Sequence, residues 1–194
     1  AGGSEKFIEI IKSKTYEAFS WKVRHYQENN VNEAWFVFTP DGKPYGFSEI
    51  LSEDLYIANL KPSEAKILAE AESVDKWNID LSNFVLIEES KDEKTSKRID
   101  HTFVYKRSDQ IVGKEGEFRL KLVVSGNKLT GVKHYVKIPE TFNRKYEEMR
   151  SSNNTIAMIA NYGLMIFYIL GGIVGGLFIL NREKWLLWKK ALYW

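Results

Sequence analysis

Short runs of alternating apolar and polar residues recur along residues 4–140. Within 18–26, for example, Phe19, Trp21 and Val23 alternate with polar side chains. A period of two residues is typical of a strand with one buried face. Similar runs predict strands at 34–38, 45–50, 84–88, 102–106, 117–124 and 132–138.

Two helical patterns are interleaved with these strands. A short helix is predicted to begin near Ser4, and a longer one over Pro62–Glu72, because proline suits the first helical position. Turns are predicted at Gly42 and Gly126, and the mixed-charge stretch 90–98 is predicted to be a solvated loop.

The two halves of this region resemble each other. Lys43-Pro-Tyr-Gly-Phe47 and Lys128-Leu-Thr-Gly-Val132 each follow a predicted turn and share the pattern K-x-x-G-apolar. Each half also has the order helix, strands, glycine turn, strand. We therefore expect an α+β fold of two tandem helix-plus-antiparallel-sheet units, at 4–60 and 61–139.

A long apolar segment follows the predicted sheet units. Residues 155–180 contain no charged side chain, and a helix of that length spans roughly 39 Å, more than the hydrocarbon core of a bilayer. The sequence therefore predicts one transmembrane helix over Thr155–Leu180. A juxtamembrane helix at 140–154 is expected to lead into it, with a short break at Ser151–Asn154.

The charges on either side of this segment predict its orientation. Arg182, Lys184 and two further lysines follow it, whereas Ser151–Asn154 precede it. By the positive-inside rule the segment 181–194 is cytoplasmic and the folded domain is extracytoplasmic, periplasmic if the source is bacterial. That topology requires an export signal or an earlier span upstream. Aromatic residues typical of the headgroup region are Trp185, Trp188 and Trp194.

Four glycines within the apolar segment form two overlapping pairs with a spacing of four residues. Small residues at this spacing let another membrane helix approach closely, although glycine is also common in membrane helices generally. The predicted partners are therefore the bilayer and other transmembrane helices, from later in the same chain or from another subunit. The glycines are Gly171, Gly172, Gly175 and Gly176.

Composition excludes several kinds of chemistry. The 28 basic and 26 acidic residues give a net charge of +2, so no nucleic-acid partner is expected, and the absence of cysteine excludes disulfides and thiolate chemistry. His25, His101 and His134 show no metal-ligand spacing, which favours ordinary strand or surface histidines, though a site assembled from all three stays open. The sequence predicts no catalytic residue, metal or cofactor.

Several stretches resemble the N-terminal region of a subset of CPBP-family intramembrane proteases, the CAAX-protease and bacteriocin-processing group. The resemblance extends from about residue 20 to 188, and it is carried by the segments 38–48, 100–108, 118–143 and 144–158. The two-unit pattern also resembles tandem PepSY-type domains. In that subset such a region precedes the membrane-embedded catalytic core.

The resemblance implies a non-catalytic segment. The family's EExxxR motif is absent, because in Glu147-Glu148-Met149-Arg150 the arginine follows the glutamate pair by two residues instead of four. The family's histidine motifs are absent as well. The first hypothesis is therefore a substrate-binding or regulatory domain that precedes an intramembrane endopeptidase core. The alternative is a single-pass accessory subunit of a larger membrane complex.

Overall fold

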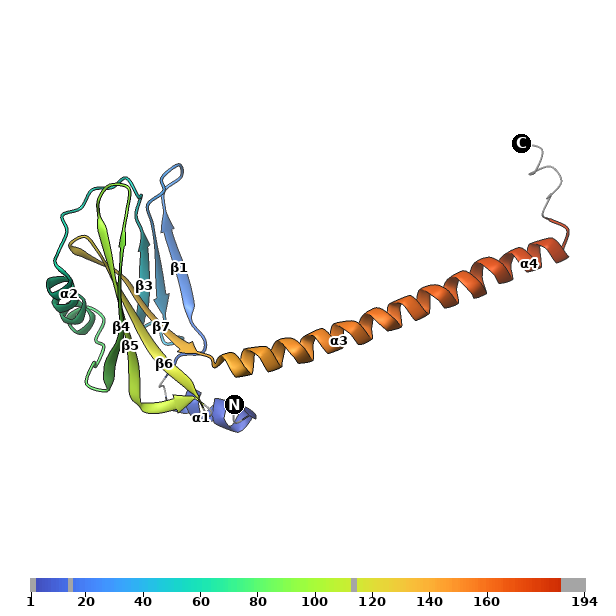
Figure 1. Cartoon of the computed structure of the whole chain (residues 1–194), viewed down its shortest axis with the longest axis horizontal. Coiled ribbons are helices and arrows are strands. Elements are labelled where there is room, and N and C mark those ends of the chain that lie inside the picture. The colour runs from blue at the N-terminus through green and yellow to red at the C-terminus, as the bar shows by residue number, and fades with distance from the viewer. Residues whose placement is uncertain (1–2, 14–15, 113–114, 186–194) are drawn as a thin grey trace. The chain divides into compact units, whose positions relative to one another are not determined.

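Within the part of the chain that the structure describes, seven strands form one antiparallel sheet in the order β1-β2-β3-β7-β6-β5-β4 (Figure 1). The structure is a computed structural model, and it describes residues 3–13, 16–112 and 115–185. The strands are β1 (Trp21–Tyr26), β2 (Glu33–Phe38), β3 (Pro44–Ile50), β4 (Phe84–Glu93), β5 (Ile99–Val112), β6 (Gly116–Ser125) and β7 (Lys128–Lys137). Short helix α1 (Gly3–Lys12) precedes β1, and α2 (Pro62–Asp75) connects β3 to β4.

The expected alternation produces the buried face of the sheet. In β6 the residues Leu120 and Leu122 are fully buried, while the adjacent Arg119 and Lys121 point to the opposite face, as a two-residue period requires. The predicted turns are also present. Gly42 and Gly126 have φ of 81° and 62°, a region that glycine enters without strain.

Strands of both expected units belong to the same sheet, and residues 1–139 form one unit by internal contacts. The connection is the pairing of β3 with β7, in which Phe47 lies opposite Val132. These two residues are the matched apolar positions of the K-x-x-G-apolar pattern. A Cβ atom on Gly46 would lie 2.6 Å from the Val132 carbonyl oxygen, so glycine permits the close approach of the two strands.

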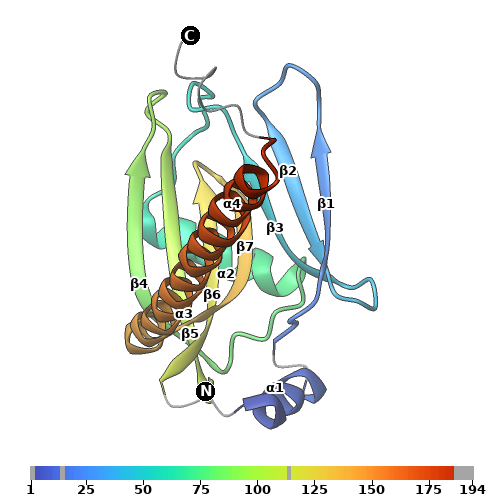
Figure 2. The same ribbon diagram turned by 90° about the vertical axis from the view of Figure 1, so that its right-hand side faces the viewer.

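Helix α2 packs on one face of the sheet over β5, β6 and β7 (Figure 2). Ala65 and Ala69 are fully buried against that face, since small side chains let the helix backbone approach the strands. The Tyr105 hydroxyl donates a hydrogen bond to Glu70 Oε1 at 2.8 Å, which joins the helix to β5. The remaining buried apolar residues of this core are Ile79, Phe103, Leu120, Leu122, Val124, Leu129 and Val132.

The prediction of a solvated loop over 90–98 is wrong for residues 90–93, whereas residues 94–97 do form the turn between two strands. Strand β4 continues to Glu93 and β5 begins at Ile99, so the two form a long polar hairpin. Strand β4 lies at the edge of the sheet, where polar side chains face water without cost, and polarity alone is therefore no sign of a loop.

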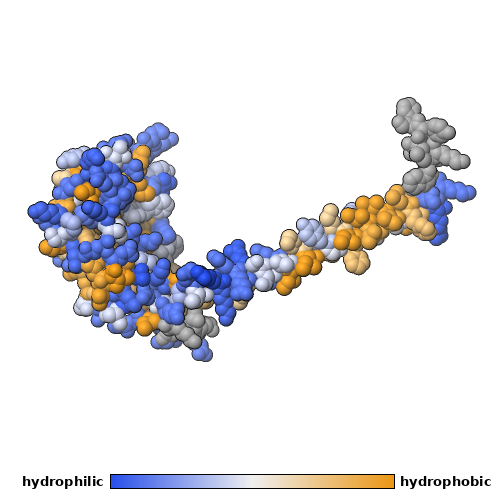
Figure 3. All heavy atoms as spheres, in the orientation of Figure 1, coloured by the Kyte–Doolittle hydropathy of each residue, from blue (hydrophilic) through white to orange (hydrophobic). Residues whose placement is uncertain are grey.

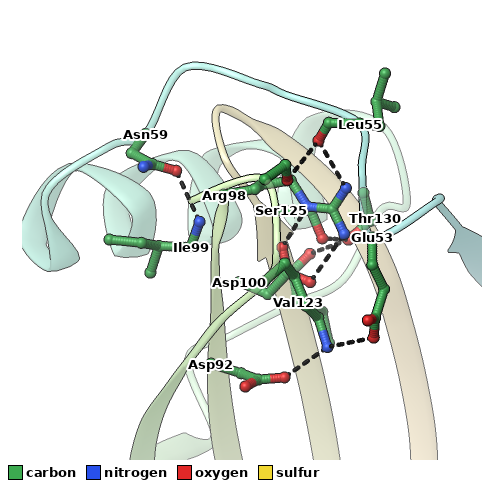
Figure 4. A network of polar contacts seen from close by, with 12 residues as sticks. Glu53, Leu55, Asn59, Asp92, Arg98, Ile99, Asp100, Val123, Ser125 and Thr130 are labelled. Carbon is green, nitrogen blue, oxygen red and sulfur yellow. Dashed lines mark hydrogen bonds and ion pairs between the residues drawn. The ribbon is translucent and has the colours of Figure 1, made fainter.

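Arg98, within that expected loop, is instead almost completely buried, with a side chain 2% exposed. Its Nε donates to Asp100 Oδ1 at 2.9 Å, and its Nη1 donates to the carbonyl oxygens of Ser52 at 2.8 Å and Leu55 at 3.2 Å (Figure 4). These hydrogen bonds link the connection between β3 and α2 to the β4–β5 hairpin.

Residues 140–182 form one uninterrupted helix, which is a separate unit from residues 1–139. It comprises α3 (Glu140–Phe167), a π-helical segment η1 (Tyr168–Val174) and α4 (Gly175–Arg182). The break expected at Ser151–Asn154 is absent. Ser152 and Thr155 donate side-chain hydrogen bonds to the carbonyl oxygens four residues earlier, both at 3.0 Å, so these polar residues are compatible with the helix.

This helix is long and apolar enough to cross a membrane. Its apolar section is visible as a continuous band of hydrophobic residues (Figure 3). No described residue of α3, η1 or α4 is buried, as expected of a surface that needs a bilayer or a protein partner around it.

Candidate functional site

A cavity of about 460 Å³ opens beside the C-terminal end of α2. It is lined by the loop that follows α2, by the β2–β3 turn, and by residues at one end of β4 to β7. Its volume falls in the range of roughly 300–1,000 Å³ that is typical of small-molecule sites. The residues that determine its chemistry are Lys43, Tyr45, Trp77, Asp80, Arg107 and His134.

His134 of β7 is the half-buried histidine of this cavity. Its Nδ1 lies 3.0 Å from the Tyr45 carbonyl oxygen, and its ring stacks on the Tyr45 ring with centroids 4.5 Å apart. A carbonyl oxygen only accepts hydrogen bonds, so Nδ1 carries the proton. Burial lowers the pKa of His134 to about 4, and the ring is therefore neutral near pH 7, with the lone pair on Nε2.

The walls beside the histidine are aromatic. The indole of Trp77 stacks on Phe47 with centroids 4.6 Å apart and planes 4° apart, and Phe47 in turn stacks on Phe36. On the other side Tyr16 packs against Phe118 at 5.9 Å. Such flat, rigid surfaces offer apolar contact at little entropic cost.

The cavity is cationic at its edge. Lys43, Lys76, Arg107 and Arg119 line it, against one lining carboxylate, Asp80. Hydrogen bonds from Ser82 hold the pKa of Asp80 below its ordinary value, so this carboxylate stays charged near pH 7.

Most of these cations already have a carboxylate partner. Lys76 pairs with Glu72 at 2.8 Å, and Arg107 pairs with Asp109 at 2.7 Å. Lys43 differs, since no carboxylate within residues 3–13, 16–112 and 115–185 lies in ion-pair distance of it. Its ammonium group is the cation most available to an incoming anion.

The other two histidines lie away from this cavity. His101 of β5 is buried, with Nε2 3.2 Å from the Leu60 carbonyl oxygen, and His25 is exposed on edge strand β1. The spacing of the three histidines in the sequence had left a shared metal site open. Among the residues that the structure describes, no three histidine or acidic side chains are grouped closely enough to hold a metal ion.

Comparisons with known protein families, with curated proteins and with solved structures found no match to this chain.

The residues predicted for membrane contact lie on the long helix or beyond it. Gly171 and Gly172 fall in η1, and Gly175 and Gly176 begin α4. A Cβ atom on Gly171, Gly175 or Gly176 would meet no described atom within 4 Å, and one on Gly172 would meet the ring of Tyr168 at 3.9 Å. Their role in helix packing stays a prediction. Trp185 is 77% exposed, while Trp188 and Trp194 lie outside the described residues.

This arrangement is suited to binding. In the described structure the Nδ1–H of His134 donates to a backbone carbonyl oxygen, which fixes the ring and leaves Nε2 as a hydrogen-bond acceptor. The sequence analysis missed the cavity, although one signal was present. In the alternation of β7, His134 falls between Val132 and Val136 on the inward-facing side.

Proposed function

We propose that this chain is a membrane-anchored, non-catalytic binding domain, whose α+β sheet domain is held at a bilayer by its C-terminal helix. The observation that carries the proposal is the exposed helix Glu140–Arg182, whose section 155–180 has no charged residue. Exposure of such a surface to water would cost far more than a soluble domain tolerates.

The charge pattern supports an extracytoplasmic domain with a cytoplasmic C-terminal segment. Arg182 and Lys184 follow the apolar section directly, and basic residues are retained on the cytoplasmic side. Trp185 adjoins them, at the level where aromatic side chains meet headgroups.

Within this role, the sequence resemblance favours a substrate-binding or regulatory domain that precedes a CPBP-like intramembrane endopeptidase core. The sharing of one sheet by two halves, with Phe47 opposite Val132, is compatible with a PepSY-like tandem origin. No catalytic residue of that family is assigned to this chain.

The second candidate is a single-pass accessory subunit of a larger membrane complex. The glycine positions suit helix packing in either candidate, because three of the four present open backbone to a neighbouring helix. The two candidates share the anchor and differ in whether the partner helices belong to the same polypeptide.

Membrane extraction with alkaline carbonate tests the anchor. The full chain is expected to remain in the membrane fraction, and Ile166→Arg combined with Ile169→Arg is expected to release it, since each charge near the helix centre costs about 2.5–3.5 kcal/mol on insertion scales. Met149→Arg is the matched control, because it lies before the apolar section. Release of the unsubstituted chain by carbonate would refute anchoring.

Cysteine labelling tests the orientation. The chain has no cysteine, so Glu148→Cys and Glu183→Cys each create a unique thiol on opposite sides of the apolar section. A membrane-impermeant maleimide added to intact cells is expected to label the first and not the second. The reverse pattern would contradict an extracytoplasmic domain.

A further inference from the structure

We infer that the cavity beside α2 binds the C-terminal residue of a peptide, holding its carboxylate at Lys43, its amide N–H at His134 and its apolar side chain against Trp77. This inference rests on the proposed function only in treating the domain as a binding module. It names the ligand class that the cavity would accept.

The excess of positive charge around the cavity indicates that the ligand has an anionic end. Four cations and one carboxylate line the cavity, and Lys43 is the cation without a carboxylate partner among the described ion pairs. Arg107 adds positive potential, since its charge opposes protonation of the neighbouring His134. An ammonium group and a carboxylate form a charge-assisted hydrogen bond, the stronger class of such bonds.

The tautomer of His134 indicates that the ligand carries a hydrogen-bond donor. The Nδ1 proton of His134 is occupied by the Tyr45 carbonyl oxygen, so the remaining ring nitrogen, Nε2, is an acceptor. His134 makes no other hydrogen bond in the described structure, and no buried side-chain atom there lacks a partner. Nε2 therefore touches the open space of the cavity and accepts from whatever fills it.

The apolar part of the ligand follows from the aromatic wall. Trp77 and Phe84 line the same cavity, and Trp77 is held flat against Phe47. Inorganic phosphate satisfies the cations but leaves this wall uncovered. A peptide C-terminus carries a carboxylate, an adjacent amide N–H and a side chain on a single residue, so it satisfies all three groups.

The test uses the full chain in lipid nanodiscs and two probes, N-acetyl-L-phenylalanine and its C-terminal amide. The three histidines give three separate imidazole signals in NMR spectra, so His25 and His101 serve as internal controls. With the acid, the signals of His134 and the Trp77 indole are expected to shift and saturate, while those of His25 and His101 stay in place. The amide is expected to bind at least tenfold more weakly, because it lacks the anionic charge.

Variants assign the contacts. Lys43→Gln is expected to weaken binding of the acid about tenfold and to leave binding of the amide unchanged, a difference of about 1.4 kcal/mol. Lys97→Gln, an exposed lysine on the β4–β5 turn, is the matched control and is expected to bind as the unsubstituted chain does. Both are surface substitutions, and the unshifted His101 signal reports that the fold is intact.

Three results would overturn the inference. They are equal affinity for the acid and the amide, displacement of the acid by an equal concentration of inorganic phosphate, or no movement of the His134 signal at millimolar acid. Because the protein is already in a nanodisc, each of these leaves the anchoring proposal standing. Failure of the chain to remain with membranes would overturn anchoring alone.

Discussion

Replacement of Arg98 by alanine is expected to destabilise the folded domain strongly. Arg98 is almost fully buried and makes a two-point contact with Asp100, whose side chain is only 15% exposed. Truncation leaves that carboxylate without its guanidinium partner, and it removes one of the two donors to each of the carbonyl oxygens of Ser52 and Leu55. The connection between β3 and α2 loses the guanidinium contacts to the hairpin, while the hydrogen bonds of Asn59 to Lys97 and Ile99 remain.

The expected loss of unfolding free energy is about 3–5 kcal/mol, the usual cost of removing one partner of a buried ion pair. With a urea dependence of roughly 2 kcal/mol per molar, the unfolding midpoint should fall by about 1.5–2.5 M. Arg98→Lys keeps the charge but provides one donor group in place of the planar fork. Its unfolding midpoint should therefore lie between those of the unsubstituted chain and Arg98→Ala.

Urea unfolding of the full chain in detergent, followed by near-ultraviolet circular dichroism of the folded domain, measures this change. Lys97→Gln is the matched control on the same turn, because its pair with Glu93 is 81% and 58% exposed and should contribute at most about 1 kcal/mol. A loss below about 1 kcal/mol for Arg98→Ala would refute the reasoning, because it would mean that water replaces the guanidinium without cost.

Two further predictions concern the histidine and the glycines. Burial lowers the pKa of His134 from an ordinary 6.5 to about 4, so the unfolded chain binds a proton between those values and the folded chain does not. Its contribution is complete above pH 6.5 and is lost progressively, by roughly 3 kcal/mol in total, as pH falls to 4. The difference in unfolding free energy between the unsubstituted chain and His134→Gln should therefore vary with pH in that window, and a constant difference would contradict burial of the neutral ring. The double variant that combines Gly172→Leu with Gly176→Leu should abolish co-purification of partner helices in detergent, whereas Gly163→Leu should not. Unchanged co-purification in the double variant would exclude packing through this face.

The strands and the long helix could be predicted because their determinants are local. Alternation in β6 and the proline at the start of α2 appear within a few residues of sequence. The apolar run 155–180 is equally local, since a bilayer requires a continuous uncharged stretch of sufficient length. These features are visible without knowledge of which strand pairs with which.

The extent of the β4–β5 hairpin was mispredicted because the second half of β4 is polar. Residues 90–93 carry no apolar alternation, and their strand conformation is imposed by pairing with β5. Arg98 likewise resembles a surface residue in sequence. Its burial depends on Ser52 and Leu55, which lie far away along the chain.

The cavity also depends on contacts between residues that are far apart in the sequence. Trp77 lies in a loop, His134 in a strand and Lys43 in a turn, and no spacing in the sequence relates them. They meet because β3 pairs with β7, which brings the β2–β3 turn beside the loop after α2. A substitution that disturbs the β3–β7 pairing should therefore alter the cavity while leaving the anchor intact. Ligand binding and membrane retention are separate predictions, and each needs its own measurement.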